Sequence, residues 1–179
     1  YFVINVVHAL TGFLIYNSKS REKAFFELVS INDWRKLGKL KKDSRIVDKE
    51  INKHVKEYED KQEYINGIYF YYFEPKYSVT GIVNGRISFK DPDETFVFVA
   101  PDLENNDKLK ISARSQNRKI NTIKLLAYAT KDFKNSSSGG HIPAAGGTIM
   151  RKDLKTFKKR LAEFMMNGKH SRIDVSKLG

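Results

Sequence analysis

The 179-residue sequence has no cysteine, which excludes disulfide bridges, thiolate zinc sites and thiol catalysis. The same absence suits a reducing compartment, and we expect a cytoplasmic protein. The most apolar stretch, residues 1–16, is shorter than a membrane span and contains Asn5 and His8, so we expect a buried helix and no membrane association. The chain begins with Tyr1 instead of Met, which predicts a fragment of a longer protein.

Acidic residues are few relative to basic ones. The chain has 33 Lys and Arg against 21 Asp and Glu, a formal net charge of +12 at pH 7. An excess of this size favours a polyanionic partner, with nucleic acid the leading class; a charged surface that only improves solubility is the alternative. The hydrophobic content of 40% is sufficient for a packed core, and the length fits one domain, with or without a small appendage.

The first third of the chain has the periodicity of helices. Two helical segments, 2–16 and 21–30, are separated by a polar break in which Ser20 can cap the second. Residues 39–65 are highly charged, but their apolar residues recur at helical spacing, which predicts one long amphipathic helix suited to connect two domains. Its apolar face contains Val47, Ile51, Val55, Tyr58 and Ile65.

After Asn66-Gly67 the sequence becomes rich in aromatic and β-branched residues. Four such runs, separated by turn signals that include Asn84-Gly85, are typical of strands. The aromatic residues at 69–73 fit either a core strand or an exposed surface for base stacking, and core packing is favoured. The four runs cover 67–79, 81–89, 95–100 and 108–115.

The remaining elements alternate between helix and strand. We predict a helix at 119–133, a short strand at 147–150 and an amphipathic helix at 153–166, with Asp153 at its start and Gly168 just past its end. This order predicts an α/β (α+β) domain over 67–168, in which helices flank a mixed β-sheet. A helical N-terminal segment and a long linker helix precede the domain, and we expect a loosely ordered tail at 169–179.

The window SSSGGHIPAAGGTI, residues 136–149, concentrates the smallest side chains around one histidine. Gly139 and Gly140 allow the backbone to approach a ligand closely. Backbone N–H groups in such a turn, ahead of a short helical segment around 143–145, suit a phosphate, and His141 can add a side-chain donor. The alternative is a flexible loop that carries a surface histidine.

A second stretch, KISARSQNRK at 110–119, places an arginine among hydroxyl groups. Ile111 and Ala113 can point inward from a strand, while Ser112, Arg114 and Ser115 line its other side or its end. A guanidinium binds oxyanions through paired donors, so this arrangement suits phosphate. The alternative is an ordinary strand that ends in a solvated arginine.

Together, ISARS and SSGGHIPAAGG resemble the DHH-associated domain, the C-terminal half of the DHH phosphoesterases, and are most similar to its RecJ-like branch of single-strand exonucleases, archaeal forms included. The resemblance covers about 67–166, and its specific part is 110–149. It implies that the partner is single-stranded nucleic acid, DNA or RNA. It also implies substrate-phosphate contacts by Arg114, Gly139, Gly140 and His141, with Ser112 and Ser115 as weaker candidates.

The chain lacks the catalytic part of that family. The resemblance implies manganese or magnesium in the intact enzyme, bound by Asp and His residues of an N-terminal DHH domain, but no Asp-His-His triplet occurs here. We therefore assign no catalytic and no metal-binding residue to this chain. Residues 1–38 are interpreted as the helical remnant of a truncated DHH domain, which is itself a partner, and 39–66 as the linker helix. The four histidines, His8, His54, His141 and His170, are scattered.

Two other functions stay open at this point. The same fold could belong to a non-catalytic replication scaffold, for which the aromatic run 69–73 would be a partner surface and replication proteins the partners. It could also belong to an oligoribonuclease or a small-nucleotide phosphatase that uses the same glycine-rich segment. The preferred interpretation is the phosphate-binding half of a metal-dependent, RecJ-like single-strand exonuclease.

Overall fold

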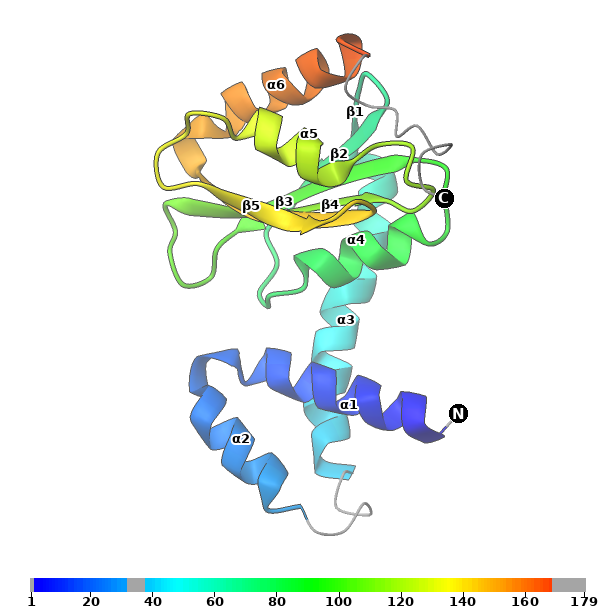
Figure 1. The fold of residues 1–179 in the computed structure, drawn as a ribbon. Helices are drawn as coiled ribbons and strands as arrows, with labels where there is room; N and C mark the ends of the chain where they lie inside the picture. Colours follow the sequence, from blue (N-terminus) through cyan, green and yellow to red (C-terminus); the bar gives the residue numbers. More distant parts are fainter. Residues whose placement is uncertain (1, 32–37, 169–179) are drawn as a thin grey trace, which may run out of the picture.

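The computed structural model describes residues 2–31 and 38–168, and the tail that the sequence predicts at 169–179 lies outside them (Figure 1). The first helices lie apart from the unit that contains the sheet, and one long helix connects them to it. These are α1 (Phe2–Tyr16), the 3₁₀ turn η1 (Ser18–Ser20), α2 (Arg21–Val29) and α3 (Gly38–Lys61). No side-chain cap is formed by Ser20, contrary to expectation.

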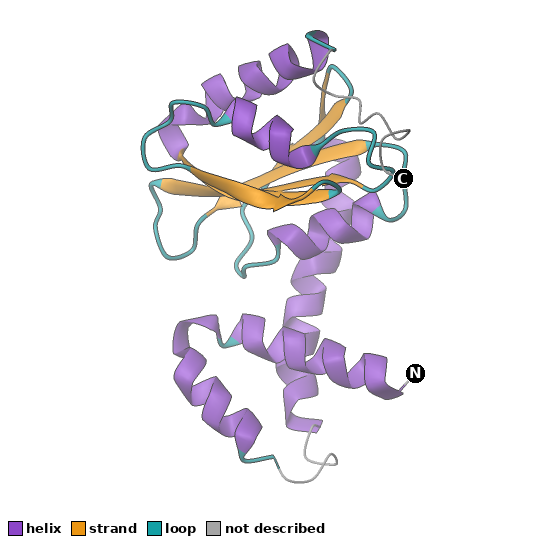
Figure 2. Ribbon diagram, viewed as in Figure 1, coloured by secondary structure: helices purple, strands orange, loops and turns teal. Residues whose placement is uncertain are grey.

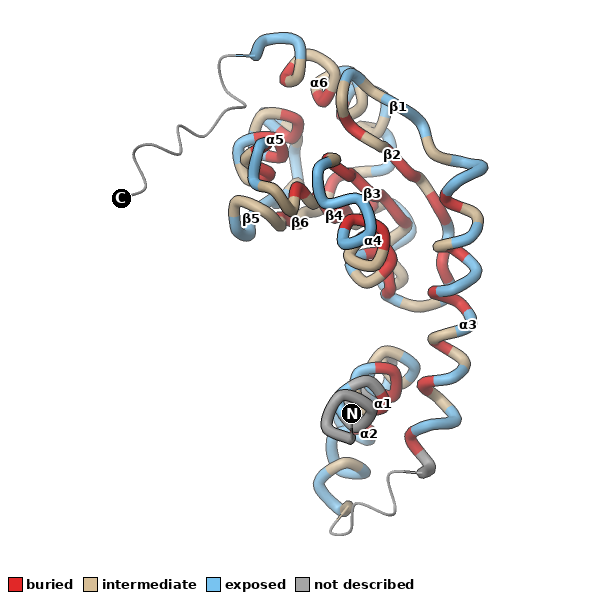
Figure 3. The backbone as a smooth tube through the Cα atoms, turned by 90° about the vertical axis from the view of Figure 1, so that its right-hand side faces the viewer, coloured by how far each residue is buried: buried red, intermediate tan, exposed pale blue. Residues whose placement is uncertain are grey.

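Helix α3 has the amphipathic character that its sequence predicts. Val47, Ile51 and Tyr58 are buried, and Figure 3 shows buried positions recurring along one side of the helix. The predicted helix extends too far, because Glu63–Ile65 forms strand β1. Asn66 and Gly67, both at positive φ, turn the chain back into the next strand, as an Asn-Gly hairpin does.

A six-stranded mixed sheet organises the rest of the chain (Figure 2). Its strand order is β1-β2-β3-β4-β6-β5, with only β2 and β3 parallel. The expected α/β class with helices on a mixed sheet is therefore confirmed. The elements after β1 are β2 (Ile68–Tyr72), α4 (Thr80–Ser88), β3 (Thr95–Pro101), β4 (Lys108–Ser115), α5 (Thr122–Ala129), β5 (Ser137–His141), β6 (Ala144–Met150), η3 (Arg151–Asp153) and α6 (Leu154–Met166).

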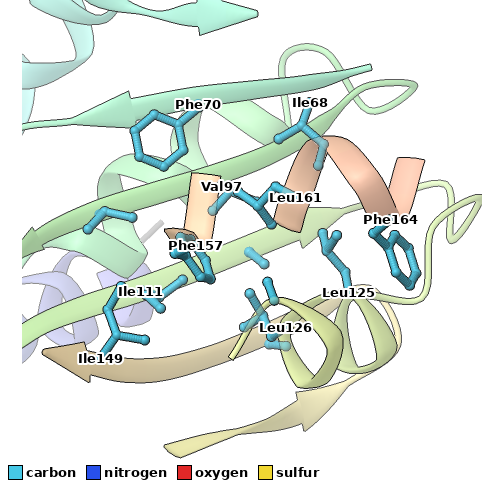
Figure 4. Close-up of a cluster of buried hydrophobic side chains, with 14 of the residues drawn as sticks. Ile68, Phe70, Val97, Ile111, Leu125, Leu126, Ile149, Phe157, Leu161 and Phe164 are labelled. Carbon is cyan, nitrogen blue, oxygen red and sulfur yellow. The ribbon is translucent and has the colours of Figure 1, made fainter. Parts of the chain in front are cut away.

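Helices α5 and α6 cover one face of the sheet, where side chains from β2, β3, β4 and β6 meet them in a closed apolar core (Figure 4). The opposite face packs against α3 and α4. Its aromatic side chains include Tyr71 and Phe73, both of which are buried. The aromatic run at 69–73 is thus part of the sheet unit, with Tyr69 and Tyr72 only partly exposed, and core packing is confirmed.

Two further sequence-based predictions are wrong. The stretch 81–89 forms most of helix α4 and not a strand, and Asn84-Gly85 lies inside that helix. Burial of one helical face, which includes Val83 and Ile87, overrides the weak helix propensity of the two glycines. The segment around 143–145 is not helical either. It belongs to a β5–β6 hairpin whose turn is Ile142-Pro143.

The start of α5 holds this hairpin turn in place. The Thr122 backbone N–H donates to the Ile142 carbonyl at 3.0 Å, and its hydroxyl lies 2.8 Å from the same oxygen and 3.1 Å from the His141 carbonyl. The Ser115 N–H donates to the Pro143 carbonyl at 2.9 Å, which ties the turn to the end of β4. Thr122 itself is fully buried. The glycine-rich segment is therefore fixed to the sheet and to a helix.

Replacing Thr122 with Val should lower the free energy of unfolding by about 1 kcal/mol, because the shape is kept but the hydroxyl donor is lost. Thr156→Val, an exposed position on α6, is the matched control and should change it by less than about 0.5 kcal/mol. Urea denaturation followed by far-ultraviolet circular dichroism measures both. Equal effects of the two substitutions would contradict the anchoring role.

Candidate functional site

An open cavity of about 570 Å³ lies where β4, β6 and β5 meet the start of α4. Its position follows from the sheet register. Arg114 is opposite Ala144, Ser112 opposite Gly146, and Lys110 opposite Thr148. These residues share the face on which β3 packs against α4, so the cavity lies beside that helix. It is lined by Ser78, Thr80, Gly81, Lys110, Ile111, Ser112, Arg114, Ser137, Ser138, Gly139, Ala144, Ala145, Gly146, Gly147 and Thr148.

Arg114 is the cationic group at one end of the cavity. It is half-buried, and among the described residues its guanidinium has no hydrogen-bond acceptor and no carboxylate partner. Burial lowers the pKa of Arg114 from its ordinary value, because a charged group is less stable away from water. A partly desolvated guanidinium without a counter-ion is ready to bind an anion, and oxyanions match its paired donors.

Ser112 lines the cavity, and hydrogen bonds from a residue of α4 fix its orientation. Asn84 of α4, fully buried, donates from Nδ2 to the Ser112 carbonyl at 2.7 Å and to its Oγ at 3.2 Å. The carbonyl can only accept, so it fixes which end of the Asn84 amide faces the strand. Because Ser112 Oγ already accepts one N–H, its own hydrogen is left to donate to a ligand.

Ser115 is not brought to this cavity. It lies on the other face of β4, where its hydroxyl accepts from the Ile120 N–H at 3.3 Å and donates to Asn117 Oδ1 at 3.2 Å. These bonds organise the turn between β4 and α5. Of the two placements expected for Ser115, on the side of Ser112 and Arg114 or at the end of the strand, the structure shows the second, because alternation turns Ser115 to the other face.

The two glycines of the Gly-Gly-His segment differ in what surrounds them. A Cβ built on Gly139 meets no atom within 4 Å, so the missing side chain leaves space in the cavity. Gly140 has φ +141°, and its Cβ would lie 2.5 Å from the Ala144 carbonyl oxygen. Gly140 therefore maintains the backbone of the hairpin, whereas Gly139 contributes to the binding space.

His141 ends β5 and is exposed. The register places it opposite Ala144, which is opposite Arg114, so the histidine shares the cavity face but lies two strands, about 10 Å, from Arg114 at the backbone. Its side chain is not part of the cavity lining. The structure thus brings Arg114, Ser112 and Gly139 together and leaves His141 at the rim.

Several lining residues escaped the sequence analysis. Thr80 and Gly81 begin α4 and Ser78 lies just before its N-cap residue, in a region where the sequence pattern predicts two strands, 67–79 and 81–89. Helix N-terminal N–H groups carry positive partial charge, so this side of the cavity also favours an anion. Lys110, at the opposite end, precedes Arg114 by an even number of strand residues, a spacing that puts both on one face and could have identified it.

The described residues include no group of three or more His, Cys, Asp or Glu side chains arranged to hold a metal ion. His54, for example, is buried in α3, where Glu50 Oε1 lies 3.1 Å from Nε2 and Glu57 Oε2 lies 3.4 Å from Nδ1. Its ring packs against Phe73. This residue joins the helix to the sheet unit.

In the part of the chain that the structure describes, no helix is long and apolar enough to span a membrane.

Comparison with known proteins agrees with the motifs. The family model of the DHHA1 domain matches residues 65–167, and no curated protein matches the sequence. Among solved structures, RecJ from Thermus thermophilus in complex with Mg²⁺ is similar at a TM-score of 0.66 and 18% identity, over 90% of this chain and 25% of RecJ. An exonuclease RecJ bound to manganese is similar at 0.58 and 19% identity, over 75% of this chain and 32% of that one.

The chain thus spans between a quarter and a third of these RecJ proteins, with which it shares a fold. The match of the DHHA1 family model over residues 65–167 confirms the resemblance of the motifs to the DHH-associated domain.

Replacing Gly140 with Ala should destabilise the chain by about 1–3 kcal/mol, because the new Cβ meets backbone atoms in a strained conformation. The same change one residue earlier, Gly139→Ala, enters open space and should stay within about 0.5 kcal/mol of the parent chain. Urea unfolding of the two variants side by side is the measurement. A Gly139→Ala variant as unstable as Gly140→Ala would show that both glycines serve only the backbone.

Proposed function

The chain belongs to the DHHA1 domain family, and we propose that its cavity binds phosphate groups of single-stranded nucleic acid for a metal-dependent DHH phosphoesterase of the RecJ-like exonuclease type. The observation that carries the proposal is Arg114, a half-buried guanidinium that lines an open cavity and has no partner among the described residues. A phosphate would supply the missing negative charge and accept two N–H bonds at once.

The surroundings of Arg114 support the same ligand. Ser112 Oγ has a hydrogen free to donate, and the first residues of α4 line the adjoining wall. Residues with side-chain carboxylates are absent from the cavity lining formed by the described residues, although Asp102 forms an ion pair with the lining residue Lys110. The formal charge of +12 adds a long-range attraction for a polyanion.

Hydrolysis itself is assigned to no residue of this chain. The described residues offer no cluster of metal ligands, whereas the RecJ relatives are named as complexes with Mg²⁺ or manganese. We propose that the ions of the intact enzyme are held in a DHH domain joined through α3, and that residues 1–38 are the remnant of that domain. The role left to residues 67–168 is to hold the substrate strand in a fixed position.

A scaffold function without a nucleic-acid ligand is less well supported. It would use the aromatic run at 69–73 as a partner surface, but Phe70, Tyr71 and Phe73 are buried inside the sheet unit. The partnerless Arg114 would then be an unexplained cost, because a desolvated charge without a counter-ion destabilises the fold.

The proposal predicts that Arg114→Gln weakens binding of a fluorescent oligothymidylate by about 10- to 100-fold at low salt, the range expected for charge-assisted hydrogen bonds. Affinity of the parent chain should also fall steeply with salt, and the slope should become shallower in the variant. Fluorescence anisotropy of the 179-residue chain measures both. His141→Ala, at the rim, should have a smaller effect.

Lys124→Gln is the matched control, since it removes one exposed positive charge from α5, on the other side of the sheet. It should change affinity by less than about twofold. If Arg114→Gln and Lys124→Gln weaken binding equally, the attraction is only the net charge of the surface and the cavity is not a phosphate site.

A further inference from the structure

Two cationic side chains line opposite ends of the same cavity. Arg114 and Lys110 are four residues apart on β4 and point to the same face, so their Cα atoms are separated by about 13 Å. Both residues line the cavity, with Ser112 between them. Side chains that start this far apart on one strand offer two separate contacts to an anionic ligand. The length of the cavity therefore suggests a ligand with two separate anionic groups.

Lys110, unlike Arg114, has an ion-pair partner among the described residues. Its Nζ lies 3.3 Å from Asp102 Oδ1, and the lysine side chain is 36% exposed while that of Asp102 is only 13% exposed. An ammonium group carries three donors, so the contact with Asp102 leaves others for a ligand. The carboxylate reduces the local positive charge, and this end should bind an anion more weakly than the Arg114 end.

Hydroxyl groups complete the Lys110 end. Lys110 is opposite Thr148, which is opposite Ser137 on the edge strand. The hydroxyls of Ser137 and Thr148 lie 2.9 Å apart, so one donates to the other. The hydrogen of the accepting hydroxyl is then available to a ligand.

The floor between the two ends is made of backbone. In the row that contains Ser112, the opposing residues on β6 and β5 are Gly146 and Gly139. A Cβ on Gly139 would meet no atom within 4 Å. A ring can therefore lie directly against the peptide groups here, at a place where any side chain would occupy the space.

Building on the proposed phosphate function, we propose that this cavity holds one internal nucleotide of a chain, that is, a nucleoside with a phosphate on each side. Arg114 binds one phosphate and Lys110 binds the next. The sugar lies over Gly139 and Gly146. The ligand class is therefore a phosphodiester-linked strand, for which a nucleoside bisphosphate is the smallest complete substitute and a nucleoside monophosphate an incomplete one.

The test is titration calorimetry of the 179-residue chain with deoxyadenosine 5′-monophosphate and with deoxyadenosine 3′,5′-bisphosphate. The parent chain should bind the bisphosphate about tenfold more tightly. Lys110→Gln should remove this difference by weakening only the bisphosphate. Asp102→Asn should strengthen the bisphosphate alone, because it releases Lys110 and keeps the Oδ1 that accepts the Glu104 N–H. Lys124→Gln, the charge-matched control, should change neither.

Filling the floor tests the position of the sugar. Gly139→Leu should weaken the bisphosphate at least tenfold, and Gly139→Ala by less, in proportion to the added volume. Both variants are checked by urea denaturation, and if the leucine variant fails to fold, the alanine variant decides.

The outcomes separate this inference from the function on which it rests. Equal affinity for the two nucleotides, or equal weakening of both by Lys110→Gln, overturns the second phosphate position while Arg114 keeps its role. Unchanged affinity for both nucleotides in Arg114→Gln overturns the phosphate function itself. Unchanged bisphosphate affinity in the folded Gly139 variants overturns the placement of the sugar.

Discussion

The antiparallel register of β4, β6 and β5 is the constraint on which the cavity depends. It aligns Arg114, Ser112 and Lys110 with Ala144, Gly146 and Thr148, and these in turn with the edge strand. A slip of one residue would turn Arg114 into the apolar core under α5 and expose Ala113 in its place. The register is held by the buried face of the same strands, whose Leu109, Ile111 and Ile149 pack against α5 and α6.

The glycines of this region have two roles: some allow the strands to pair in that register, and one leaves space in the cavity. Gly140 and Gly147 stand where a Cβ would clash with backbone atoms of the paired strand. They permit the close approach of β5 to β6. Gly139 has open space above it. A glycine-rich hairpin has few side chains to fix its pairing register. The hydrogen bonds that Thr122 and Ser115 make to its turn fix the position of the hairpin instead.

The sequence predicts much of this arrangement, because its strongest signals are local. The alternation in ISARS predicts that Ser112 and Arg114 lie on one face of the strand and the core residues on the other. The Asn-Gly turn and the apolar face of α6 are predicted just as directly from the sequence. Helix α4 could not be predicted, because Gly81 and Gly85 favour turns and only packing against β3 makes the segment helical. The hydroxyls and N–H groups that α4 adds to the cavity were missed for that reason. For Ser115 the sequence left two placements open, because alternation is hard to assign at the end of a strand.

The most direct test of the cavity as the nucleic-acid contact is amide chemical-shift mapping. A ¹⁵N-labelled 179-residue chain is titrated with a short single-stranded oligonucleotide. The largest shifts should fall in the strand segments 110–114 and 137–148 and at the start of α4, with smaller ones on α6. Shifts concentrated on α3 or α6, with the amides of Ser112, Arg114 and Gly139 unchanged, would contradict a phosphate site in this cavity.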